Sequence, residues 1–161
     1  MKTILAMNFE EGYKYFRDSN NSGYVMISTR NSGSNLFNFM RTERCKDILW
    51  LDYETDYDNE KCYRFNSYHA DDVVEFIKKN RKRRTWVIVS YDNVSRARTL
   101  RYAVMKCLGL PYEESTDDID MFVADQIIEA WEKSKRPPKP LKPVMINGKI
   151  EFVEDDNDEN N

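Results

Sequence analysis

Short apolar runs alternate with stretches of helical spacing along the first two thirds of the chain. The runs Thr3–Met7, Tyr24–Thr29, Asp47–Tyr53 and Trp86–Val89 are rich in aliphatic, β-branched or aromatic residues and predict strands. Between them, apolar residues recur three and four positions apart, which predicts helices. Strands that alternate with helices indicate βαβ units. We therefore predict an α/β fold with a central, mainly parallel sheet flanked by helices.

Two of the predicted helices have a recognisable start signal. Asn8 with Glu11, and Ser115 with Asp118, have the spacing of a capping box. A third helix is predicted from Arg96 to Leu108, because its apolar positions recur at helical spacing and a glycine and a proline follow it.

The C-terminal part has a different pattern. The Pro-rich stretch 135–143 predicts an extended, stiff linker after an α/β domain over residues 1–134. Residues 144–153 form two short apolar arms around Asn147-Gly148, the pair typical of a type I′ hairpin turn. An isolated hairpin is only marginally stable, so we expect it to dock on its own domain, on a second copy or on a partner. Residues 154–161 predict a disordered acidic tail.

Composition restricts the class of protein. The chain has 161 residues, 40% hydrophobic and 33% charged, which suits one soluble domain. No apolar run approaches the ~20 residues of a membrane span, and the N-terminus lacks the apolar length of a signal peptide. Cys45, Cys62 and Cys107 are widely spaced and odd in number, which indicates reduced thiols. We expect a cytoplasmic protein without a metal, a cofactor or a membrane partner.

Positive charge is concentrated in the middle of the chain. The net charge is −3, and residues 151–161 hold six acidic and no basic residues, so residues 1–150 carry +3. The basic residues either solvate a helix end or form a surface for a phosphoprotein, another protein partner or a nucleic-acid backbone. This predicted basic patch comprises Lys78, Lys79, Arg81, Lys82, Arg83, Arg84, Arg98 and Arg101.

The loop between the fourth predicted strand and the helix after it is the candidate binding site. A strand, a tight loop and a helix N-terminus direct backbone N–H groups at one spot, which suits a phosphate or sulfate. Arg96 can contact two phosphate oxygens, or it can pair internally with a carboxylate such as Asp92. The predicted phosphate-binding residues are Ser90, Tyr91, Asp92, Asn93, Val94, Ser95 and Arg96.

This loop resembles the phosphate-binding loop of the cysteine phosphatases, in particular the dual-specificity and tyrosine phosphatases. In that family a nucleophilic Cys, five residues and an Arg lie between a buried strand and a helix. Ser90-x5-Arg96 keeps the spacing, and Ser95 matches the small hydroxyl residue before the Arg. Residues 66–80 resemble the amphipathic helix before the loop strand, and the similarity covers about residues 24 to 132.

The chemical part of the signature is changed. Ser90 stands at the position of the nucleophile, Val89 at that of the preceding His, Asn93 at that of a loop Gly and Ala97 at that of the second hydroxyl. These several changes favour a native Ser90 over one introduced to trap substrate. Asn tolerates the backbone conformation of a Gly position better than most residues, so the loop can still bind phosphate.

The resemblance also implies a general acid, for which Asp56 is the nearest equivalent, with Glu54 and Asp58 beside it; the other interpretation is a solvated acidic loop. A serine hydroxyl has a far higher pKa than a thiol, and no neighbouring base is evident, so we expect no turnover through a covalent phospho-enzyme.

Three functions are consistent with the sequence. The first is a catalytically inactive phosphatase-like protein that binds a phosphorylated or anionic macromolecule through the loop and the basic patch. The second is an active phosphatase on protein or RNA 5′-phosphates. The third is a structural or inhibitory protein that uses the hairpin and tail. Plentiful Asn, Asp, Lys and Tyr with only five Gly are typical of AT-rich coding, as in many phages and viruses, which suggests a viral protein.

Overall fold

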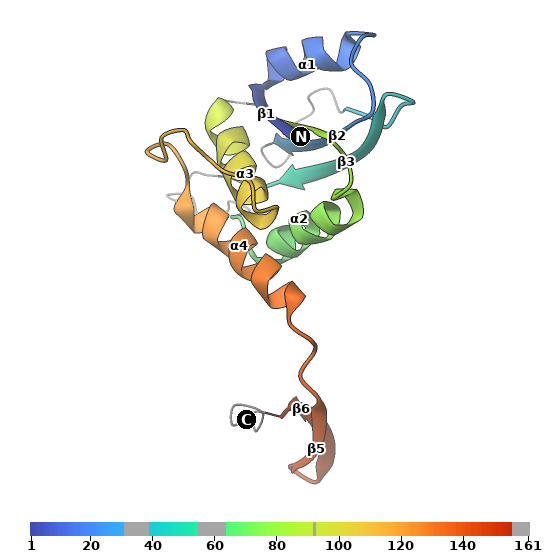
Figure 1. The fold of residues 1–161 in the computed structure, drawn as a ribbon. Helices are drawn as coiled ribbons and strands as arrows, with labels where there is room; N and C mark the ends of the chain where they lie inside the picture. Colours follow the sequence, from blue (N-terminus) through green and yellow to red (C-terminus); the bar gives the residue numbers. More distant parts are fainter. Residues whose placement is uncertain (31–38, 55–63, 92, 156–161) are drawn as a thin grey trace.

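The computed structural model describes residues 1–30, 39–54, 64–91 and 93–155. The described chain forms a layered α/β body from which a C-terminal hairpin extends (Figure 1). The elements of the body are β1 (Thr3–Asn8), α1 (Phe9–Arg17), β2 (Tyr24–Arg30), β3 (Cys45–Asp52), α2 (Ser67–Asn80), β4 (Thr85–Ser90), α3 (Val94–Cys107) and α4 (Met121–Lys135). The hairpin consists of β5 (Leu141–Ile146) and β6 (Lys149–Glu154).

The four strands of the body form one parallel sheet in the order β1-β4-β2-β3. The predicted α/β fold with a parallel sheet is therefore confirmed. β4 lies inside the sheet, where Ser90 is level with Asn8 on one side and Thr29 on the other. Because all the strands run in the same direction, the residues after β4 share one edge of the sheet with the residues after β1, β2 and β3.

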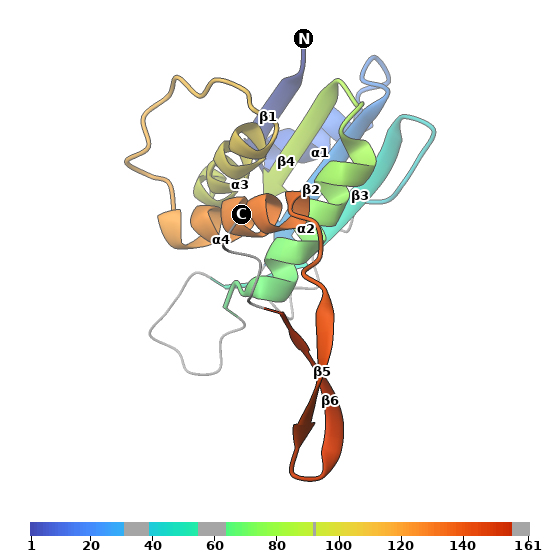
Figure 2. The same ribbon diagram turned by 60° about the horizontal axis from the view of Figure 1, so that its bottom comes forward.

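Helices cover both faces of the sheet. Successive side chains of a strand point to opposite faces, so Trp86 and Ile88 of β4 pack into the core under α2, α3 and α4, whereas Val87 and Val89 pack on the α1 side. The two views agree that α1 lies across the sheet from the other three helices (Figures 1 and 2). This alternation explains why all four residues are completely buried.

One predicted helix start is confirmed and one is wrong. The Asn8 side chain accepts a hydrogen bond from the Glu11 amide and the Glu11 carboxylate accepts one from the Asn8 amide, which completes the capping box of α1. The predicted start at Ser115 is wrong, because α4 begins at Met121 with Asp120 as its N-cap. The Asp120 amide donates to the Thr99 hydroxyl at 3.0 Å, so contact with α3 determines where α4 begins.

The C-terminal hairpin forms around the predicted turn. Asn147 and Gly148 both have positive φ, 49° and 74°, as a type I′ turn requires. The pairing starts at Leu141, which extends the hairpin into the predicted linker, and the Asp155 amide donates to the Pro140 carbonyl at 2.9 Å. Among the described residues, no helix is long and apolar enough to cross a membrane.

Candidate functional site

The candidate loop lies at the carboxyl edge of the sheet. β4 ends at Ser90 and α3 begins at Val94, so three residues connect them; one of these, Asp92, lies outside the described residues. The chain leaves β1 for the α1 side and β4 for the α3 side, and ligands of open α/β sheets generally bind at such a switch point. Here the stacked rings of Phe9 and Tyr91, with centroids 4.5 Å apart, lie at the ends of these two strands.

Ser90 is completely buried and its hydroxyl donates a hydrogen bond to the Asn93 carbonyl. This bond closes the loop on itself. A nucleophilic serine needs a base that removes its proton, whereas here the proton is directed at a carbonyl. His69, the only histidine of the chain, is engaged with other groups: its Nδ1 accepts a hydrogen bond from the Asn66 amide in the capping box of α2, and its Nε2 is 3.0 Å from the Asp52 carbonyl. The arrangement gives Ser90 a structural role.

Asn93 begins the helix without strain. Its φ is −143° and ψ is 170°, an extended conformation that any residue adopts. Its side chain accepts a hydrogen bond from the Ser95 amide at 2.9 Å, so it serves as the N-cap of α3. The Ser95 amide, which a phosphate bound at the start of α3 would need as a donor, therefore already has a hydrogen-bond partner within the protein.

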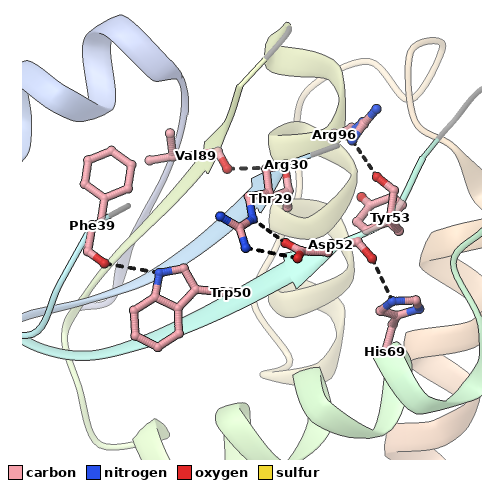
Figure 3. Close-up of polar contacts among 9 residues, drawn as sticks. All are labelled: Thr29, Arg30, Phe39, Trp50, Asp52, Tyr53, His69, Val89 and Arg96. Atoms are coloured by element: carbon pink, nitrogen blue, oxygen red, sulfur yellow. Dashed lines mark hydrogen bonds and ion pairs between the residues drawn. The ribbon is translucent and has the colours of Figure 1, made fainter. Parts of the chain in front are cut away.

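Arg96 lies in the first turn of α3 and is only 6% exposed. Its Nη1 donates to the Tyr53 carbonyl at 2.7 Å, and its guanidinium lies 5.3 Å from the centroid of the Tyr53 ring (Figure 3). Arg96 thus links α3 to the residue that follows β3. A pocket of about 130 Å³ lies beside it, far below the size typical of a site for a drug-sized ligand. Its lining residues are Tyr53, Asn93, Ser95, Arg96, Thr99, Asp120 and Val123.

A second arginine at this edge was not predicted from the sequence. Arg30 and Asp52, the last residues of β2 and β3, lie side by side in register and form a two-point ion pair with N–O distances of 2.6 and 3.1 Å (Figure 3). The hydrogen bond with Asp52 is the main reason why the pKa of Arg30 is raised. The sequence contains a signal for this ion pair, because each of the two strands ends in a charged residue and the two charges are opposite.

The residues proposed for general-acid catalysis are only partly described. Asp56 and Asp58 lie outside the described residues. Glu54 lies two residues after the end of β3 and forms an isolated backbone bridge with Arg64.

The predicted basic patch divides into two groups of four. The members of one group each form an ion pair: Lys78 with Glu75, Lys79 with Asp47, Arg98 with Asp118 and Arg101 with Glu114. The members of the other group are consecutive, exposed and form no ion pair with any residue that the structure describes. We call this second group, Arg81, Lys82, Arg83 and Arg84, the basic turn.

The basic turn and the candidate loop lie at opposite ends of β4. The turn precedes Thr85 and the loop follows Ser90, so the whole strand, roughly 17–20 Å for six residues, lies between them. No small anion can contact both. A macromolecule, in contrast, can approach either edge independently.

A buried carboxylate beside the basic turn shows how the neighbouring cations are neutralised. Asp47 of β3 is 4% exposed and accepts contacts from Lys79, Arg41 and the Asn80 amide group at 2.8 to 3.0 Å. Burial raises the pKa of Asp47, but the hydrogen bonds from Asn80 and Lys79 and the charges of Lys79 and Arg41 outweigh it and hold the pKa below its usual value.

The described cysteines do not provide a nucleophile. Burial raises the pKa of the Cys45 and Cys107 thiols to about 12, so both are protonated at neutral pH. Cys62 lies outside the described residues. In the described part of the chain, no group of three His, Cys, Asp or Glu side chains could hold a metal ion.

A scan against protein-family models and searches of curated proteins and of solved structures return no match to this chain.

Proposed function

We propose that this protein acts by binding an anionic macromolecule rather than by catalysis, and that the basic turn is its main contact. The observation that carries this proposal is the set of four consecutive, exposed side chains, Arg81 to Arg84, without an ion pair in the described chain. Such a cluster attracts phosphate groups and releases their counterions, whereas a paired cation first has to leave its carboxylate.

The backbone of the basic turn is held in place, which favours binding. The Arg83 amide donates to the Asn80 carbonyl at 2.8 Å, and the Trp86 indole donates to the Arg83 carbonyl at 3.2 Å. Lys2 also donates to the Arg81 and Arg83 carbonyls and adds a fifth positive charge. A preorganised turn loses less conformational entropy when it binds.

The test compares two double variants that remove equal charge. Lys82→Gln/Arg83→Gln removes two unpaired cations, and Arg98→Gln/Arg101→Gln removes two paired ones. We expect the first to weaken binding of a fluorescent DNA or RNA oligonucleotide, or of a multiply phosphorylated peptide, by about tenfold, and to reduce the salt dependence by about two charges. The second should change binding less than about twofold. Equal loss in both variants, or a wild type that binds none of these probes, would contradict the proposal.

A second candidate function is recognition of a single phosphoryl group at Arg96. It is supported by the pocket beside Arg96 and by the resemblance to the cysteine phosphatases. Titration with inorganic phosphate and with a phosphotyrosine peptide tests it, with Arg96→Lys as the variant and Arg98→Lys on the same helix as the control. Binding that is lost only in Arg96→Lys supports this site.

The same preparations distinguish binding from catalysis. Because the Ser90 hydroxyl is buried and donates to a carbonyl, we expect no turnover of p-nitrophenyl phosphate, a phosphopeptide or a triphosphorylated RNA. Turnover that Arg96→Lys abolishes would establish an enzyme and overturn the proposal.

A further inference from the structure

The C-terminal hairpin has one face that is almost entirely apolar. Paired residues of an antiparallel hairpin share a face, and the faces alternate along each strand. The pairs Leu141–Glu154, Pro143–Phe152 and Met145–Ile150 therefore form one face, on which five of six residues are apolar. The opposite face is mixed, with Lys142, Val144, Ile146, Lys149, Glu151 and Val153.

The apolar face is exposed. Leu141, Met145, Ile150 and Phe152 are each 61–69% exposed, and the hairpin stands apart from the body (Figures 1 and 2). In the described part of the body, the open groove between α2 and α4, about 710 Å³, has polar or charged residues at most of its lining positions, such as Asp71, Glu75 and Glu129. A contiguous apolar surface of this kind marks an interaction site.

The edges of the hairpin are less suited to association than this face. In a two-residue hairpin, the pair that flanks the turn is hydrogen-bonded and the pairs then alternate. Pro143 falls at a position whose nitrogen points away from β6, so the outer edge of β5 lacks a donor there. The outer edge of β6 belongs to a strand with three charged residues, Lys149, Glu151 and Glu154, a feature that discourages edge pairing.

We infer that the apolar faces of two copies of this chain pack against each other and form a symmetric dimer. A regular face with a single charged residue, Glu154 at its end, can pack on a second copy of itself, and a two-fold axis allows the same patch to serve on both copies. Each copy presents on the order of 500 Å² of apolar surface on this face, so a dimer buries roughly 1,000 Å², the lower limit for a specific interface. The second copy also supplies the further strands that a lone hairpin needs for stability.

The area predicts a weak dimer, with a dissociation constant in the micromolar range. The Pro-rich connector from Arg136 to Pro140 holds the face away from its own domain, so the bodies of two copies do not obstruct the contact. Association would also present two basic turns to one macromolecule, although the dimer itself does not depend on the proposed binding function.

Sedimentation velocity of the full chain tests the inference, with two matched substitutions beside the turn. Ile150→Glu places a charge on the apolar face, and Ile146→Glu makes the same change on the opposite face. We expect the wild type and Ile146→Glu to dimerise with rising concentration. We expect Ile150→Glu to weaken association by at least about tenfold, and Ile150→Glu/Phe152→Glu by at least about 100-fold.

Hydrogen exchange at low and high protein concentration locates the contact. Amides of Leu141–Ile146, apart from Pro143, and of Lys149–Glu154 should gain protection at high concentration in the wild type and not in Ile150→Glu/Phe152→Glu. A wild type that remains monomeric would overturn the inference. The inference would also be overturned if the dimer persists in the double variant, or if Ile146→Glu weakens the dimer as much as Ile150→Glu does.

Discussion

Arginines lie near both ends of β4, and the two sets differ in the contacts that the rest of the protein makes with them. At the carboxyl end, Arg96 is buried against Tyr53, and Arg30 is paired with Asp52. At the amino end, the side chains of Arg81 and Arg83 are exposed and form no ion pair within the described chain. A charge that stabilises the fold is less available to a ligand, because binding would first have to break its internal contacts.

The comparison changes the interpretation of the sequence motif. Ser90-x5-Arg96 has the spacing of a phosphate-binding loop, but Ser90, Asn93 and Arg96 each make a hydrogen bond within the protein. The basic turn has no motif, yet its four side chains are exposed and form no ion pair within the described chain. Motif spacing and availability for binding are therefore separate properties.

The largest expected effect is on the free energy of unfolding, and it distinguishes the buried Arg96 from the exposed Arg83. Arg96→Ala should reduce the free energy of unfolding by about 3 kcal/mol, because it removes a buried charged donor and leaves the Tyr53 carbonyl without this bond. Arg83→Ala should leave the free energy of unfolding unchanged within error. Urea unfolding followed by circular dichroism measures both. A similar loss in the two variants would mean that the ends of β4 do not differ as described.

Asp47 should make stability depend on pH near the basic turn. Its pKa is lowered in the folded state relative to the ordinary value of 3.8, so its contribution is complete above that value and is lost as the pH falls through the lower, folded value. Asp47→Asn should therefore cost about 2 kcal/mol at pH 7 and reduce the loss of stability below about pH 4. Urea unfolding from pH 7 to pH 2 measures the effect, and an unchanged acid limb would contradict it.

The Asp47→Asn variant also tests which end of β4 binds a polyanion. Asp47→Asn removes the carboxylate that neutralises Lys79 and Arg41, so it should strengthen polyanion binding by a few-fold if the amino end is the binding edge. Weaker binding in this variant, with the fold intact, would place the binding edge elsewhere.

The smallest expected effect is the loss of stability when the Ser90 hydroxyl is removed. Ser90→Ala should cost about 1–2 kcal/mol, because the hydrogen bond from the buried Ser90 to the Asn93 carbonyl is lost. Ser95→Ala should cost less, because its hydroxyl contact with the Asp118 carbonyl is exposed. Thermal unfolding compares the two variants, and neither should change phosphatase activity above the background. Measurable wild-type turnover that only Ser90→Ala abolishes would instead assign Ser90 a catalytic role.

Several features could be predicted from the sequence because their causes are local. Asn8 and Glu11 lie one helical turn apart, so each side chain can accept a hydrogen bond from the other residue's amide without help from distant residues. Asn147-Gly148 accepts the positive φ of its turn without tertiary help. The separation of the basic turn from the loop was also available from the sequence, because the residues of β4 lie between them.

Which charges remain available was decided by tertiary structure. Arg98 meets Asp118 and Lys79 meets Asp47 across 20 and 32 residues of chain, and no local pattern identifies these partners. The start of α4 likewise depends on the bond between Asp120 and Thr99. Local sequence determines backbone conformation through short-range sterics and hydrogen bonds, whereas the pairing of a charge depends on which distant carboxylate the packing of sheet and helices brings within a few ångströms.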